Sequence, residues 1–178
     1  LPFDGVGLDF VEGVKSLELI QTYGFPADKI LFAGVINGKK IWRNAYAKTC
    51  SLIETLQTYC NEIVLSTSCS LQHVPDTLEH ENKLSQDYKK YFAFAEEKLR
   101  ELQELKEILE ENTYQTEQFL QNCQLFSQER SGINHAVQER VAAIQDNDFV
   151  RLPEFTAREQ IQKEILNLPL FPTTTIGS

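Results

Sequence analysis

Three short β-type runs, each followed along the chain by a helical pattern, constrain this fold more than any other feature. The runs are Gly5–Phe10, Lys29–Ile36 and Glu62–Ser68. The second and third are almost continuously apolar, which is typical of strands buried on both faces of a sheet. Repeated strand–helix units favour parallel strands joined by right-handed crossovers. The sequence therefore predicts an α/β fold.

Helical periodicity fills the rest of the chain. Val14–Tyr23 and Asn44–Cys60 follow the first two runs, and Ser85–Glu111 forms the longest periodic segment. We expect this segment to be one long helix packed against a sheet or barrel, because about three heptads are few for a coiled coil. Its apolar stripe comprises Tyr88, Phe92, Ala95, Leu99, Leu102, Leu105 and Leu109.

Three further segments are expected to be helical: Glu117–Arg130, Asn134–Ala143 and Thr156–Leu166. Thr156 is a candidate N-cap for the last helix. Pro169 and Pro172 then indicate an extended linker.

The three strands would leave two open, apolar sheet edges, which native proteins avoid. Additional strands from outside this sequence would remove that problem. A closed (β/α) barrel provides them, and a doubly wound sheet is the structural alternative. The sequence also contains no Met, and its apolar pattern is interrupted at both ends. We therefore expect the chain to be a piece of a larger protein.

Charge and composition exclude several classes of partner. The formal net charge is −9, and most of it lies in residues 76–178. Such a surface repels phosphate backbones, so neither nucleic acid nor a membrane is expected as a partner. No apolar run reaches about 18 residues and no secretory leader is evident. We expect free thiols in a reducing cytoplasm, since no Cys-x-x-Cys pair occurs among Cys50, Cys60, Cys69 and Cys123.

Polar residues at the strand ends are the first candidate site, because ligands of parallel α/β folds bind at the carboxyl ends of strands. These residues are Asp9, Asn37 and the run Ser66–Ser70. The run could ligate a metal or hold a small polar ligand. The favoured interpretation is structural: the hydroxyls cap the turn and satisfy backbone groups.

Other candidate chemistry is weaker. Cys69, His73 and His80 offer a Cys-x-x-x-His spacing without a second ligand pair, so we expect no zinc here. A lone Cys69 nucleophile has no evident His–carboxylate partner. Gly34 and Gly38 are predicted to bracket a turn, but no dinucleotide-binding glycine loop is present. The single tryptophan, Trp42, is expected to pack in the core or at its rim.

The closing run Phe171–Ser178 favours an extended strand that ends in glycine and serine. Gly177 would let a ligand approach the backbone, and Ser178 adds a hydroxyl. These groups suit the carboxylate or amino group of a small amino acid. Physical chemistry alone favours an ordinary linker strand.

The phrases LPLFPTTTIGS, FPADKILFAGVINGKKIW and IVLSTSCSLQHVP resemble cobalamin-independent methionine synthase, and the resemblance covers essentially the whole chain. It implies that residues 1–111 are the C-terminal part of an N-terminal (β/α)8 TIM-type barrel. Residues 112–168 would form a helical connection. Residues 169–178 would be the linker and first strand of a C-terminal catalytic barrel.

The resemblance also implies a reaction. A methyl group passes from 5-methyltetrahydropteroyl-triglutamate to homocysteine, giving methionine, with zinc and without cobalamin. In this family zinc lowers the pKa of the homocysteine thiol, so that a thiolate attacks the methyl carbon at neutral pH. The zinc ligands and the proton-donating histidine would lie beyond Ser178, so this chain alone would be inactive. Ile176, Gly177 and Ser178 would hold the homocysteine or methionine backbone, and Cys69 would be a relic of a duplicated zinc site.

Two classes of function stay open. The chain is either the scaffold part of such a methyltransferase or a free-standing binding or structural domain derived from its barrel. In the first case its partners are the two small substrates and the remainder of the same polypeptide. That complete protein is expected to be a cytoplasmic monomer.

Overall fold

The computed structural model of the chain describes residues 2–111, 113–128 and 133–173. They fall into two compact units, residues 1–129 and residues 130–178. No helix among the described residues is long and apolar enough to cross a membrane.

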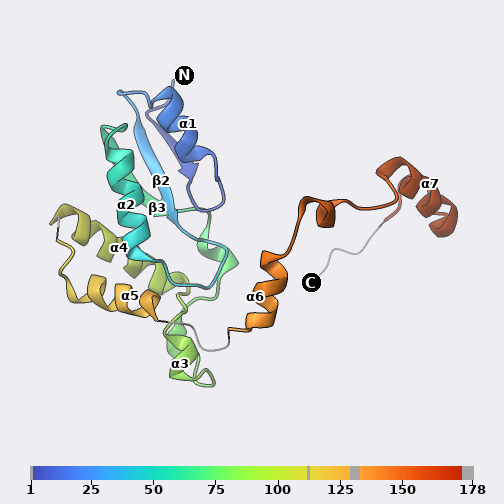
Figure 1. The fold of residues 1–178 in the computed structure, drawn as a ribbon. Coiled ribbons are helices and arrows are strands. Elements are labelled where there is room, and N and C mark those ends of the chain that lie inside the picture. The colour runs from blue at the N-terminus through green and yellow to red at the C-terminus, as the bar shows by residue number, and fades with distance from the viewer. Residues whose placement is uncertain (1, 112, 129–132, 174–178) are drawn as a thin grey trace. The chain divides into compact units, whose positions relative to one another are not determined.

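A three-stranded parallel sheet organises the first unit (Figure 1). Its strands are β1 (Gly5–Asp9), β2 (Ile30–Ile36) and β3 (Glu62–Thr67), in the order β1-β2-β3. The pairs Gly7–Phe32 and Phe32–Val64 set the register. The predicted parallel strands are thereby confirmed, each within one residue of its expected bounds.

Seven helices and three short 3-10 turns occur in the described residues. The first unit holds α1 (Ser16–Tyr23), α2 (Tyr46–Gln57), the 3-10 turns Leu71–His73 and Leu78–His80, α3 (Gln86–Lys89), α4 (Ala95–Glu110) and α5 (Glu117–Ser127). The second unit holds α6 (His135–Ala142), the 3-10 turn Asp146–Phe149 and α7 (Phe155–Leu166).

The prediction of one long helix over Ser85–Glu111 is wrong. Only α3 and α4 are helical, and the chain between them runs antiparallel to the segment that follows β2. There the amide of Ala93 donates to the carbonyl of Ile41 (2.7 Å), and the amide of Arg43 donates to the carbonyl of Tyr91 (2.9 Å). This pairing satisfies backbone groups that a continuous helix would have satisfied internally.

The predicted apolar stripe of this segment is also partly wrong. Tyr88 lies on α3 and is 54% exposed, and Leu99 on α4 is 56% exposed. Leu105 is fully buried as expected. The buried face of α4 is shared by charged and apolar side chains, namely Glu97, Lys98, Glu101, Leu105 and Ile108.

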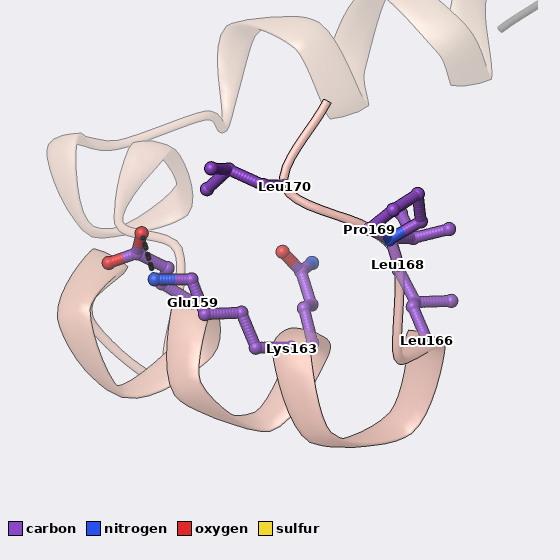
Figure 2. A pocket seen from close by; sticks show the side chains of 7 residues that line it. Glu159, Lys163, Leu166, Leu168, Pro169 and Leu170 are labelled. Atoms are coloured by element: carbon purple, nitrogen blue, oxygen red, sulfur yellow. Dashed lines mark ion pairs between the residues drawn. The ribbon is translucent and has the colours of Figure 1, made fainter. Parts of the chain in front are cut away.

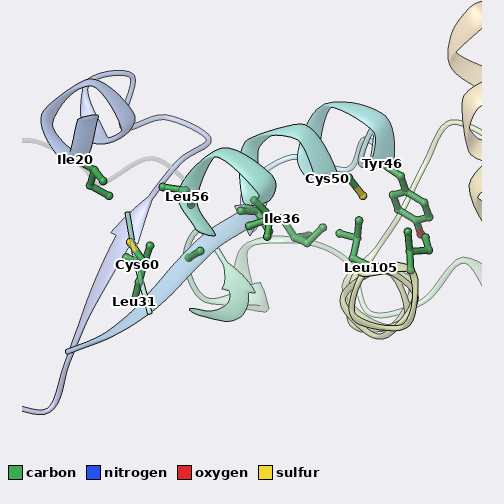
Figure 3. Packing of buried hydrophobic residues seen from close by; sticks show 12 residues of the cluster. Ile20, Leu31, Ile36, Tyr46, Cys50, Leu56, Cys60 and Leu105 are labelled. Carbon is green, nitrogen blue, oxygen red and sulfur yellow. The ribbon is translucent and has the colours of Figure 1, made fainter. Parts of the chain in front are cut away.

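The hydrophobic core lies between the sheet and helices α2 and α4 (Figure 3). Each fully buried Leu or Ile contributes roughly 1.5–3 kcal/mol relative to an exposed one. Alternation along β2 sends Leu31 and Ala33 into this core and Phe32 to the opposite face. The innermost side chains are Leu31, Ala33, Ile36, Ile53, Leu56, Leu105 and Ile108.

The second face of the sheet is much less covered by the described residues. Phe32 is 41% exposed and Val64 is 39% exposed, although both are central strand positions. β1 and β3 each pair on one side only within the same part of the chain. An apolar face and two edges are thus left available.

The second unit has no buried side chain among residues 133–173. α7 begins at Phe155 with Glu154 as its N-cap, so the predicted cap at Thr156 is wrong, and Thr156 lies in the first turn. Asn167 ends the helix in a left-handed conformation (φ 44°), which asparagine tolerates. Beyond it the chain folds back over the helix (Figure 2) and encloses an open groove of about 530 Å³ lined by Glu159, Gln162, Lys163, Leu166, Leu168, Pro169 and Leu170.

Candidate functional site

The polar strand ends lie together at one edge of the sheet, as expected for parallel strands. Asp9 pairs with Gly34, and Gly34 also pairs with Ser66. A register shift between Gly34 and Ile36 then brings Ile36 opposite Thr67. Gly34 therefore lies within β2 and does not begin the following turn, which corrects the prediction for this residue.

Asp9 and Asn37 use their side chains to shape the turns that follow β1 and β2. Asp9 Oδ1 accepts hydrogen bonds from the amides of Val11 (2.7 Å) and Glu12 (3.0 Å). Asn37 Oδ1 accepts hydrogen bonds from the backbone amides of Lys39 and Lys40, both at 2.9 Å. Such bonds stabilise tight turns.

The hydroxyls after β3 also bond to the backbone. Ser68 Oγ accepts from the amide of Gly38 (3.1 Å), and Thr67 Oγ1 donates to the carbonyl of Cys69 (2.8 Å). Ser70 Oγ accepts from the amide two residues later (3.4 Å). The structural interpretation of this run is confirmed for these three hydroxyls.

Gly38 and Lys39 join the strand ends more tightly. A Cβ on Gly38 would lie 2.5 Å from the carbonyl oxygen of Cys69 and 2.9 Å from its sulfur, so glycine is needed for the close approach. Lys39 Nζ forms an ion pair with Glu12 Oε2 at 2.7 Å. The hydrogen bond and charge of Glu12 raise the pKa of Lys39, with smaller contributions from Cys69 and Asp9.

The candidate zinc residues are spread over separate turns. Cys69 is half-buried, and its thiol lies 3.7 Å from the carbonyl oxygen of Ser70. His73 and His80 are exposed, at the ends of the two 3-10 turns. Within residues 2–111, 113–128 and 133–173, no three His, Cys, Asp or Glu side chains are placed to hold a metal ion. The expected absence of zinc stays a prediction.

Two other predictions have different outcomes. Trp42 is 46% exposed and packs its ring 5.2 Å from that of Phe92, so it lies at the rim of the core. The triplet Ile176, Gly177 and Ser178 lies outside the described residues.

Sequence reasoning missed a buried polar group on α4. Lys98 and Glu101 are 0% and 2% exposed, although charged residues usually face solvent. Glu97 accepts hydrogen bonds from the amides of Phe94 (3.1 Å) and Leu78 (3.2 Å) and so ties the start of α4 to the preceding turn. The available signal was spacing: these three residues lie on the helical face of Leu105, one and two turns earlier.

Two comparisons with known proteins show what this chain is similar to. Residues 1–61 match the family described as Cobalamin-independent synthase, N-terminal domain. The chain is also similar to proteins named 5-methyltetrahydropteroyltriglutamate–homocysteine methyltransferase. It is 55% identical to the one from Campylobacter jejuni subsp. jejuni serotype O:23/36 (strain 81-176) and 51% identical to the one from Lactococcus lactis subsp. cremoris (strain MG1363).

These alignments cover 99% and 100% of this chain, respectively, but 23% of each relative. The chain thus spans about a quarter of the length of the curated relatives it matches. Its first 61 residues resemble the N-terminal domain of cobalamin-independent synthases, and its whole length resembles one segment of much longer methyltransferases.

Proposed function

We propose that this chain is a segment of a cobalamin-independent methyltransferase. The complete protein would move a methyl group from 5-methyltetrahydropteroyl-triglutamate to homocysteine and form methionine. One observation carries this proposal: 55% identity over 99% of the chain to a relative whose name states that reaction. Because the chain spans only 23% of that relative, the reaction belongs to the complete protein.

In this proposal residues 1–111 are scaffold, the last strand–helix units of a (β/α)8 barrel. The parallel sheet with helices over one face supports it. Two open grooves border β3: one of about 260 Å³ is lined by α2, β3 and α4, and one of about 420 Å³ by β3 and α4. Further elements of the same polypeptide would cover the open face and edges. Residues 112–168 would connect this barrel to a second one that begins within residues 169–178.

Ile176, Gly177 and Ser178 would hold the amino-acid end of homocysteine. The support is the resemblance of the closing run, together with chemistry: a glycine permits close approach, and a serine hydroxyl can donate to a carboxylate. The same resemblance implies that zinc would be held by residues outside this chain.

The alternative is a free-standing binding or structural domain that performs no catalysis. A reading frame open on both sides of the encoding segment favours the methyltransferase, whereas a Met start and a stop codon after Ser178 favour the domain. A cytoplasmic, monomeric complete protein is part of the same proposal.

Steady-state kinetics on the complete protein tests both the reaction and the site. We expect cobalamin-independent methionine formation from homocysteine and the triglutamate substrate. Gly177→Val should raise the homocysteine KM steeply because its bulk occupies the ligand position. Ser178→Ala should cost roughly 1–2 kcal/mol of binding. Zinc content should stay constant in both variants.

Each failure has its own meaning. Binding of homocysteine without turnover by the unmodified protein contradicts the methyltransferase. Turnover with an unchanged homocysteine KM in both variants contradicts the triplet alone and identifies it as a linker strand.

A further inference from the structure

The turn that leads into α2, residues 42–46, is held by side chains from α4. Lys98 Nζ donates a hydrogen bond to the carbonyl of Trp42 (3.1 Å). The amide of Asn44 donates to Glu101 Oε1 (3.0 Å). Two charged side chains one helical turn apart thus hydrogen-bond to the backbone of this turn.

Helix α5 holds the same turn from a second direction. Asn122 Oδ1 accepts from the amide of Tyr46 (2.9 Å), and Asn122 Nδ2 donates to the carbonyl of Asn44 (2.9 Å). The Asn44 side chain itself donates to the carbonyl of Val35 in β2 (3.1 Å). The turn is therefore fixed to the sheet and to two helices by hydrogen bonds.

Glu101 is the member of this network that is not fully satisfied. It is 2% exposed, and its second oxygen, Oε2, has no hydrogen-bond partner among the described residues. An ionised carboxylate with a bare buried oxygen costs more free energy than a neutral one. Geometry alone therefore favours the neutral form of this side chain in the closed turn.

The surrounding charges leave that preference in place. Burial raises the pKa of Glu101 to about 7, against the amide of Asn44 and the positive charges of Lys98 and Arg43, which lower it. The negative charge of the neighbouring Glu104 makes a smaller contribution in the same direction as burial, and the value of about 7 includes all of these effects.

On the α2 side, Glu101 faces Tyr46, whose pKa is raised by burial and by its hydrogen bond to Glu104 Oε2 (2.5 Å). The Tyr46 hydroxyl therefore stays neutral. Burial also lowers the pKa of Lys98. With a pKa of about 7, Glu101 is a buried side chain of this cluster whose charge changes near neutral pH.

We propose that Glu101 is a protonation-dependent latch on residues 42–46, in which the neutral carboxyl holds the turn closed and loss of its proton loosens it. An opened turn exposes Glu101 to water, where its pKa returns towards the ordinary 4.5. The closed turn gains its full stabilisation below that pH. This stabilisation decreases as the pH rises from there to about 7, and above about pH 7 the stability of the closed turn no longer changes with pH.

The latch acts on the end of the sheet where the carboxyl ends of the strands lie. Asn37 and Lys39 lie in the same connection between β2 and α2, a few residues before the latched turn. Opening of residues 42–46 would release one end of this connection. Proton uptake at Glu101 closes the turn, so it would restrict the motion of the residues at the carboxyl ends of the strands.

Hydrogen exchange of the complete protein, followed by mass spectrometry between pH 5 and 8, tests the latch. After correction for the intrinsic pH dependence of amide exchange, opening of residues 42–50 should increase by up to about ten-fold per pH unit below about pH 7 and then level off. Glu101→Gln keeps the acceptor for Asn44 but cannot ionise, so its opening should not vary with pH. Glu110→Gln, an exposed change on the same helix, should behave like the unmodified protein.

Lys98→Met supplies a second measurement. Without this positive charge the pKa of Glu101 should rise, so the levelling-off should move to higher pH. Opening that is independent of pH in the unmodified protein overturns the proposal. So does a pH dependence that persists in Glu101→Gln, or an unshifted levelling-off in Lys98→Met.

Discussion

At the scale of single residues, close backbone approach at Gly38 fixes the turn after β2 to the turn after β3. The contact is with the backbone of Cys69, which cannot move away as the end of a flexible side chain could. Ser68 Oγ reinforces it by accepting from the Gly38 amide. The polar strand ends are thus held by geometry as well as by hydrogen bonds.

Gly38→Ala should therefore destabilise this edge by roughly 1–3 kcal/mol, as expected for overpacking. The measurement is the free energy of local opening of residues 33–38 and 64–70, from hydrogen exchange of the complete protein. Gly7→Ala is the matched control, because a Cβ at Gly7 meets no atom within 4 Å. Equal protection in the two variants would show that the Cys69 turn can move aside at little cost.

At the scale of elements, Asn122 joins α5 to the start of α2 through one buried and one partly buried hydrogen bond. Asn122→Ala leaves the amide of Tyr46 and the carbonyl of Asn44 without partners, at roughly 1–3 kcal/mol for each group. Hydrogen exchange of the complete protein should show loss of protection at the first turn of α2. Gln121→Ala, on the exposed side of α5, is the control, and comparable losses in both variants would contradict this role.

The elements also show where sequence reasoning succeeds. β2 and β3 were predictable because a nearly continuous apolar run of that length is characteristic of a strand buried on both faces. The break at Tyr91–Phe94 was not, because it depends on pairing with residues 41–43, some fifty residues earlier. The buried positions of Lys98 and Glu101 were missed for a related reason: their partners are backbone groups of a distant turn.

At the scale of the whole molecule, both units expose apolar surface. In the first unit Phe32 and Val64 lie on the less covered sheet face, and β1 and β3 have one unpaired side within the described residues. In the second unit, α6, α7 and the segment just after α6 expose Val137, Val141, Ile144, Phe155, Ile161, Ile165 and Leu166. Single exposed apolar residues are ordinary, but the described part of this unit, residues 133–173, contains no buried side chain and therefore no core.

We therefore expect the isolated 178-residue chain to bind a dye such as ANS, to self-associate and to unfold without a sharp transition, because open strand edges and uncovered apolar faces promote pairing between copies. The complete protein should bind little dye under the same conditions, since its additional elements would cover these surfaces. Dye fluorescence, analytical ultracentrifugation and calorimetry measure the three properties. A chain of residues 1–128 should bind no more dye than the 178-residue chain, because the described residues 133–173 add exposed apolar side chains of their own. A monomer that unfolds cooperatively and binds no dye would show that the chain is self-sufficient, and would favour the free-standing domain over the barrel segment.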